Sequence, residues 1–179
     1  YAVIVSGGEY DTMVEDDYSK DLRVLWPNSI IRWSVDSAPG NIHYNTVVDI
    51  TTKAFQKWEE IIPRWFAQVS NPNEADINIL FVNRYHHIAQ SDEHFKYGTI
   101  AHASRTNPIP YIHINKNVDY VLDDSDGYNL FTVVLHEIGH LLSIPHNKNH
   151  FSVMFAYYPI NVFQNYSFSS DEIEEARKL

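Results

Sequence analysis

The spacing of hydrophobic residues predicts both helices and strands along the chain. Over residues 47–62, large apolar side chains recur every three or four positions, as on one face of an α-helix, and Pro63 marks the end of that helix. Ile77, Ile79 and Phe81 alternate with their neighbours, which predicts a strand with one face turned inward. Shorter runs rich in β-branched and aromatic residues predict further strands at 1–5, 30–35, 99–103 and 111–114.

Two more helices complete this pattern. Residues 130–143 form a strongly apolar run without proline, which predicts a buried helix that ends before Pro145. The last helix begins at Ser169, because Ser169 and Glu172 match a capping box. The order of elements predicts an α+β fold in which three main helices pack on a single mixed, twisted sheet.

The composition limits the domain organisation and the class of partner. The chain has 179 residues, enough for one domain with a substantial core. Its formal net charge of −10 argues against nucleic acid and anionic membranes as main partners. No apolar run approaches the roughly 18 residues of a membrane span. The absence of cysteine excludes disulfides, thiolate catalysis and cysteine-ligated zinc.

Residues 136–146 contain the clearest functional motif. His136 and His140 are four residues apart, so a helix presents both to one ion, while His146 must return through a turn near Ser143. Three neutral imidazoles leave a fourth position open to water, which is the arrangement of catalytic zinc. Glu137 lies beside the first histidine and is the predicted general base that activates this zinc-bound water for peptide hydrolysis.

The segments around this motif resemble the matrixins, the matrix metalloproteinase branch of the metzincin peptidases. The resemblance extends over nearly the whole chain and rests on residues 1–4, 73–79, 100–103, 129–146 and 152–158. It implies a metzincin fold with an active-site cleft along an edge strand, and residues 1–179 as a single catalytic domain in mature form, without a propeptide. Met154 matches the methionine that underlies the metal site.

The resemblance also implies a second, structural zinc. His102 and His113 match two of its ligands, and His87 lies at the right distance before His102 to be the third. The aspartate ligand of the family would fall near Ala89, which cannot bind metal, so either Asp92 substitutes for it or the site is altered. Calcium sites are expected to be reduced or absent, because residues 115–117 and the shortened loop at 106–110 lack the acidic oxygens that calcium prefers.

On the substrate side, the resemblance implies that an extended protein or peptide pairs with Ile100 and Ala101 on the edge strand. Tyr158 would form part of the wall of the main specificity pocket. Thr132 matches the position that can plug this pocket. Because threonine is small, we expect a deep pocket that takes a large apolar residue just after the cut.

Two further positions matter for activation and for the turn at the metal site. Asp171 matches the aspartate that accepts the N-terminal ammonium, here that of Tyr1, although it could simply favour the N-terminus of its own helix. Ser143 stands where the family has glycine, so the turn after the zinc helix should be strained or reshaped.

Other interpretations remain at this stage. A thermolysin-type site needs a distant glutamate ligand, which His146 makes unnecessary, and the absence of cysteine disfavours astacin- and adamalysin-like enzymes. Another metzincin branch, or a weakly active toxin or binding module that keeps the fold, are the alternatives. We expect a secreted, extracellular monomer that acts on protein substrates, with protein inhibitors as further partners; the location rests on the family alone.

Overall fold

The computed structural model describes residues 26–88, 91–95, 98–105, 109–123, 125, 127–158 and 164–177, without the side chains of 87, 88 and 91–94. The described helices are α2 (Tyr44–Glu59), α3 (Leu130–Leu141) and α4 (Ser170–Arg177), with a short 3-10 helix η1 (Pro72–Glu74). The strands are β1 (Ile30–Val35), β2 (Trp65–Gln68), β3 (Ile77–Val82), β4 (Tyr85–Ile88), β5 (Ser91–His94), β6 (Ala101–Ser104), β7 (Tyr111–Asn115), β8 (Tyr120–Val121) and β9 (Tyr128–Asn129).

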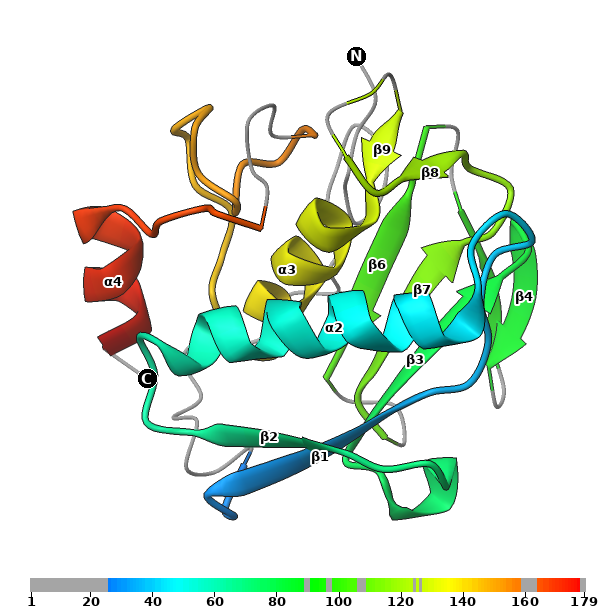
Figure 1. The fold of residues 1–179 in the computed structure, drawn as a ribbon, viewed down its shortest axis with the longest axis horizontal. Helices are drawn as coiled ribbons and strands as arrows, with labels where there is room; N and C mark the ends of the chain where they lie inside the picture. Colours follow the sequence, from blue (N-terminus) through cyan, green and yellow to red (C-terminus); the bar gives the residue numbers. More distant parts are fainter. Residues whose placement is uncertain are drawn as a thin grey trace.

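Five of these strands form one twisted, mixed sheet in the order β2-β1-β3-β7-β6 (Figure 1). The first four run parallel, and β6 pairs antiparallel with β7 at one edge. The sheet and the three helices confirm the predicted α+β fold. In β3, buried and half-buried positions alternate as the sequence pattern predicts, whereas β7 lies between two neighbours and is buried along its whole length.

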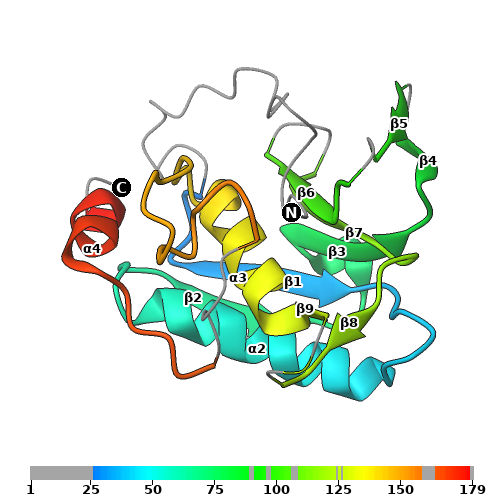
Figure 2. The ribbon, with the colours of Figure 1, turned by 90° about the horizontal axis from the view of Figure 1, so that it is seen from above.

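The helices α2 and α3 lie side by side along the sheet, and α4 lies near the C-terminal end of α2 (Figures 1 and 2). The apolar face of α2 enters the core, where Phe55 stacks on Trp33 of β1 with ring centroids 5.0 Å apart. Trp58 of α2 donates a hydrogen bond of 2.9 Å to the carbonyl of Leu135 in α3. This bond joins the two helices at the level of the metal motif.

Helix α3 is buried over all twelve of its residues, as its apolar sequence predicts. Its first turn is capped by Asn129, whose side chain accepts a hydrogen bond from the backbone N–H of Thr132. The capping box predicted for α4 is also present: Glu172 accepts from the N–H of Ser169, and Ser169 Oγ accepts from the N–H of Glu172. Among the described helices, none has the length and apolarity of a membrane span.

The sequence pattern did not predict β2 or the two small sheets, β4-β5 and β8-β9. The residues of β2 are exposed or half-buried at the edge of the main sheet, so they lack an alternating pattern. Strands β8 and β9 contain two residues each, which is too short for any periodicity. The strand predicted at residues 1–5 lies outside the described part of the chain.

Gly139 allows α3 to pack closely against the segment that follows the metal motif. A Cβ at this position would overlap the Met154 sulfur and lie 2.9 Å from Cζ2 of Trp58. Met154 and Trp58 are both fully buried, so neither has open space to move into. Glycine is therefore required here by space and not by backbone conformation.

We predict that Gly139→Ala lowers the free energy of unfolding by about 1–3 kcal/mol, the typical cost of overpacking a core, even though alanine favours an ordinary helix. Gly40→Ala is the matched control, because nothing lies within 4 Å of a Cβ there. Urea unfolding of both variants measures the difference. A Gly139→Ala protein as stable as its parent would contradict this packing.

Candidate metal centre

Three histidine rings converge beside the sheet. His136 and His140 lie one turn apart on α3 and are fully buried, and His146 returns to them from beyond the helix end. The Nε2 atom of His140 lies 3.0 Å from Nε2 of His136 and 3.2 Å from Nε2 of His146. The structure therefore brings together the three residues that the motif predicts.

Backbone carbonyls set the protonation of the two helical rings. Nδ1 of His136 lies 2.6 Å from the carbonyl oxygen of Val153, and Nδ1 of His140 lies 3.1 Å from that of Ile144. A carbonyl can only accept, so each Nδ1 carries the proton and each Nε2 presents a lone pair. Lone pairs 3.0 Å apart repel one another unless a cation lies between them.

The donor set fits zinc. Zn–N bonds of about 2.0–2.1 Å in a tetrahedron place ligand nitrogens about 3.3–3.4 Å apart, close to the spacings found here. Burial lowers the pKa of His140 well below its ordinary value, and the neighbouring rings of His136 and His146 lower it further. His140 is therefore neutral at neutral pH, which is the form that binds metal.

The chain leaves α3 through a Schellman turn. The N–H of Ser143 donates to the carbonyl of His140 at 3.0 Å, and that of Ile144 donates to the carbonyl of Gly139 at 2.9 Å. Ser143 has a φ of +67°, in the left-handed region that favours glycine. For a residue with a side chain this backbone costs roughly 1–2 kcal/mol. The same turn aims the Ile144 carbonyl at His140 and directs the chain toward His146.

Helix α4 also helps to position the ring of His136, through the turn at residues 152–153. The buried carboxylate of Glu172 accepts hydrogen bonds from Ser152 Oγ at 2.6 Å and from the N–H of Val153 at 3.1 Å. The Tyr166 hydroxyl donates a hydrogen bond to the same carboxylate. Burial raises the pKa of this hydroxyl most, and the hydrogen bond to Glu172 raises it further. Because the Val153 carbonyl faces His136, Glu172 holds the turn that orients this ring. The sequence identified Glu172 only as a helix cap, and no local pattern reveals its contact with residues 152–153.

Glu137 follows His136 on α3 and is fully buried. Tyr120 lies within electrostatic range of it: burial raises the pKa of the Tyr120 hydroxyl, and the Glu137 charge raises it further. The hydroxyl therefore stays protonated, and it donates to the carbonyl of Asn115 at 2.8 Å. A carboxylate next to a three-histidine site can accept a proton from a water molecule there.

A second cluster of three histidines spans the sheet edge. His102 of β6 and His113 of β7 are cross-strand partners, with Nε2 of His102 3.2 Å from Nδ1 of His113. His86 of β4 joins them, and the three potential ligand atoms lie within 4.8 Å of one another. The sequence pointed to His87 as the third member. Its backbone lies in β4, but its side chain and that of Asp92 are outside the description, as is Ala89.

The predicted substrate residues lie in two places, at the start of β6 and around the first turns of α3. Ile100 and Ala101 are buried where the edge strand β6 begins. Thr132 is fully buried on α3, and Tyr158 accepts a hydrogen bond of 2.8 Å from the N–H of Asn129. Burial raises the pKa of the Tyr158 hydroxyl, while its contacts with Asn129 and with the Thr132 side chain lower it. The structure thus brings Thr132 and Tyr158 together.

The remaining predicted residues lie around this centre. Met154 is fully buried, and its side chain packs against Gly139 of α3, the helix that carries the metal motif. Asp171 is exposed in the first turn of α4. Tyr1, its predicted partner, lies outside the described residues.

Comparisons with known proteins point to one family. A family model described as Matrixin matches residues 25–179. Matrix metalloproteinase-26 of Homo sapiens is 29% identical over 164 residues, which cover 88% of this chain and 60% of that protein. Macrophage metalloelastase of Rattus norvegicus is 35% identical over 160 residues (88% of this chain, 34% of that protein). A putative matrix metalloproteinase of Heliothis virescens ascovirus 3e is 35% identical over 153 residues (79% and 32%).

The chain spans 60% or less of the length of these three relatives. The family match nevertheless covers all but the first 24 residues of the chain and includes both histidine clusters. The chain belongs to the matrixin family.

Proposed function

We propose that this chain is the catalytic domain of a zinc-dependent endopeptidase that cleaves extended protein substrates. The observation that carries the proposal is the convergence of His136, His140 and His146 at Nε2 spacings of 3.0–3.2 Å, with Glu137 on the same helix. A structural zinc site takes four protein ligands, whereas three leave a position for water and substrate. Family membership supports the same chemistry.

In this mechanism His136, His140 and His146 hold the ion, and each helical ring is kept in position by its carbonyl partner. A zinc ion bound there supplies Lewis acidity for the scissile carbonyl and lowers the pKa of water to about 7. Glu137 takes the proton of the attacking water and passes it to the leaving amine. Its complete burial keeps bulk water away from this proton transfer.

The substrate would lie along β6 and pair with Ala101, the first residue of this strand, and with Ile100 just before it. Strand β6 is the last strand in the order of the main sheet, and an edge strand of this kind can pair with an added strand. This position supports the proposed path of the substrate. Thr132 and Tyr158 would line the pocket for the residue after the cut. Because Thr132 is small, we propose a preference for a large apolar side chain there.

The second cluster is proposed to hold a structural zinc through His102, His113 and His86. We favour His86 over the neighbouring His87 because its ring lies against the other two, with centroids 5.4 Å from His102 and 4.7 Å from His113. Nδ1 of His86 faces the carbonyl of Asn83 at 3.0 Å, so its Nε2 is the available ligand atom.

Calcium binding is proposed to be reduced or absent. Asn115 lies where an acidic run is expected, and its side-chain oxygen already accepts from the N–H of Asn117 at 3.1 Å. The chain is proposed to act as a secreted, monomeric catalytic domain to which protein inhibitors can bind. Asp171 is proposed to accept the N-terminal ammonium of the mature domain. The alternative function is a weakly active binding module, and the activity measurement below separates the two.

Replacing Glu137 by glutamine should lower kcat/KM on a quenched peptide by about 10²–10⁴-fold, because the amide cannot accept the proton. Zinc content should stay unchanged, since all three histidines remain. Zinc analysis of the same preparation is the control. A parent protein that binds zinc but cleaves nothing would favour the binding module, and a fully active Glu137→Gln protein would exclude Glu137 as the base.

Metal analysis should find two zinc ions in the parent, one in His86→Ala and two in His87→Ala, because only the first variant removes a proposed ligand. His113→Ala is the positive control for loss of the second ion. Loss of an ion from His87→Ala alone would assign the third ligand to His87 instead.

A peptide library varied at the residue after the cut should show preference for Leu, Met or Phe over Ala or Asp. Thr132→Leu should shift the preference toward smaller residues, because the longer side chain would fill the pocket. Thermal unfolding of the variant checks that the buried substitution keeps the fold. A parent that prefers alanine or a charged residue would contradict the pocket.

A further inference from the structure

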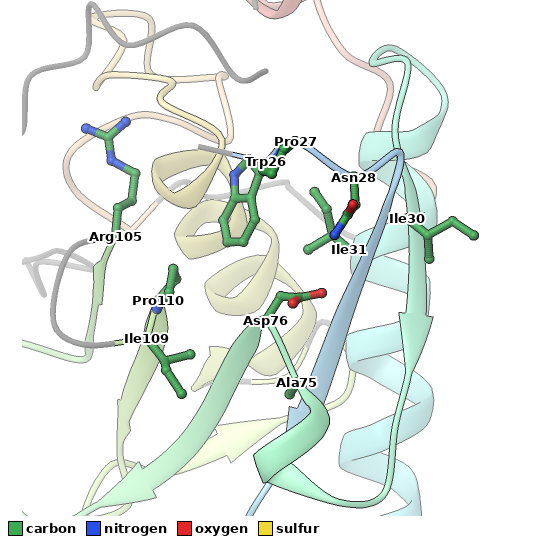
Figure 3. Close-up of a pocket in the computed structure, with 10 residues that line it drawn as sticks. All are labelled: Trp26, Pro27, Asn28, Ile30, Ile31, Ala75, Asp76, Arg105, Ile109 and Pro110. Carbon is green, nitrogen blue, oxygen red and sulfur yellow. The ribbon is translucent and has the colours of Figure 1, made fainter. Parts of the chain in front are cut away.

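The C-terminal end of α3 contacts two side chains from outside the metal motif. Trp26 Nε1 donates to the carbonyl of Leu141 at 3.4 Å, and Arg105 Nη1 donates to Oγ of Ser143. Arg105 directly follows β6, and together with Trp26 it lines a pocket of about 360 Å³. Figure 3 shows both side chains among the residues that line this pocket. The end of the zinc helix is thus connected to the strand at the sheet edge.

The contact between Arg105 and Ser143 is buried on both sides. Arg105 is 7% exposed and Ser143 is 3% exposed. A buried hydroxyl without a partner destabilises a fold, and a buried guanidinium needs acceptors. Each residue therefore supplies part of what the other requires. A glycine at position 143 would adopt the same backbone and would have no hydroxyl that needs a partner. The contact with Arg105 is therefore needed only because residue 143 is serine.

We propose that Arg105 is a positioning residue for the zinc site: by holding Ser143 in its left-handed turn, it fixes the path from His140 to His146. The turn has two effects on the site. It places the Ile144 carbonyl that orients His140, and it directs the chain toward His146. This inference rests on the proposed zinc function. It adds Arg105, which lies outside the zinc-binding motif, to the residues on which retention of the metal depends.

The charge of Arg105 allows a positional role to be separated from an electrostatic one. Arg105 is close enough to lower the pKa of His140, after the larger effects of burial and the neighbouring rings. A positive charge near the site repels a zinc ion, so an electrostatic role alone predicts tighter zinc binding when the charge is removed. A positioning role predicts the opposite result.

The test is a double-mutant cycle of Arg105→Met and Ser143→Gly. Zinc release into an excess of chromogenic chelator is followed in the parent, both single variants and the double variant. His146→Ala identifies which release phase belongs to the three-histidine site. We expect Arg105→Met to speed this phase about 10-fold, Ser143→Gly to change it less than 2-fold, and the double variant to behave like Ser143→Gly, because glycine holds the turn unaided.

Slower or unchanged release from Arg105→Met would overturn the proposal, as would an undiminished effect of Arg105→Met in the Ser143→Gly background. If Arg105→Met does not fold, Arg105→Lys replaces it in the cycle, and an effect of lysine that is equal in both backgrounds overturns the proposal.

If the parent shows no release phase that depends on His146, the proposed zinc function fails instead. The urea midpoint of the metal-free proteins then reports the same coupling. A midpoint that Arg105→Met lowers in the parent background but not in the Ser143→Gly background supports the contact, and equal losses in both backgrounds overturn it.

Discussion

Two hydrogen bonds between histidine rings and backbone carbonyls set the chemistry of the three-histidine site. They direct the protons of His136 and His140 away from one another and leave two lone pairs facing a common point. Each carbonyl belongs to a different turn after α3, so both turns must be correctly formed before the rings can converge. The Schellman turn supplies one carbonyl, and the turn held by Glu172 supplies the other. The turn at Ser143 and the contacts of Glu172 with residues 152–153 therefore place these two carbonyl oxygens.

The sequence predicted the centre of this site because its spacing is local. His136, Glu137 and His140 lie within two turns of one helix, so the helical period alone places them together. Glu172, Arg105 and Trp26 act through contacts between residues 20 to 115 positions apart, which no short pattern encodes. The second cluster is an intermediate case, since the choice between two consecutive histidines depends on strand register, and a shift of one residue exchanges the faces.

The fold was predictable to a similar degree and for the same reason. Helix α2 and strand β3 each have one buried face, and this face leaves a periodic pattern. Helix α3 and strand β7 are buried along their whole length and leave apolar runs instead, and α4 is recognisable from its capping box. The parallel pairing of β1 with β2 and β3 comes from the sheet as a whole, and β2 has too little buried surface to signal its own presence. Periodicity therefore reports burial, and elements with little burial escape it.

The close packing of Gly139 against Met154 has a consequence for oxidative damage. Because the Met154 side chain is fully buried in the folded chain, an oxidant reaches its sulfur only when the turn around it opens. The methionine sulfoxide formed then is larger and polar, and it would have to return to a space too small even for a methyl group on residue 139. Oxidation during a transient opening would hold the turn open and displace the Val153 carbonyl from His136. Because Gly139 and the Met154 sulfur pack without spare space, oxidation of this sulfur would change the geometry of the histidine site.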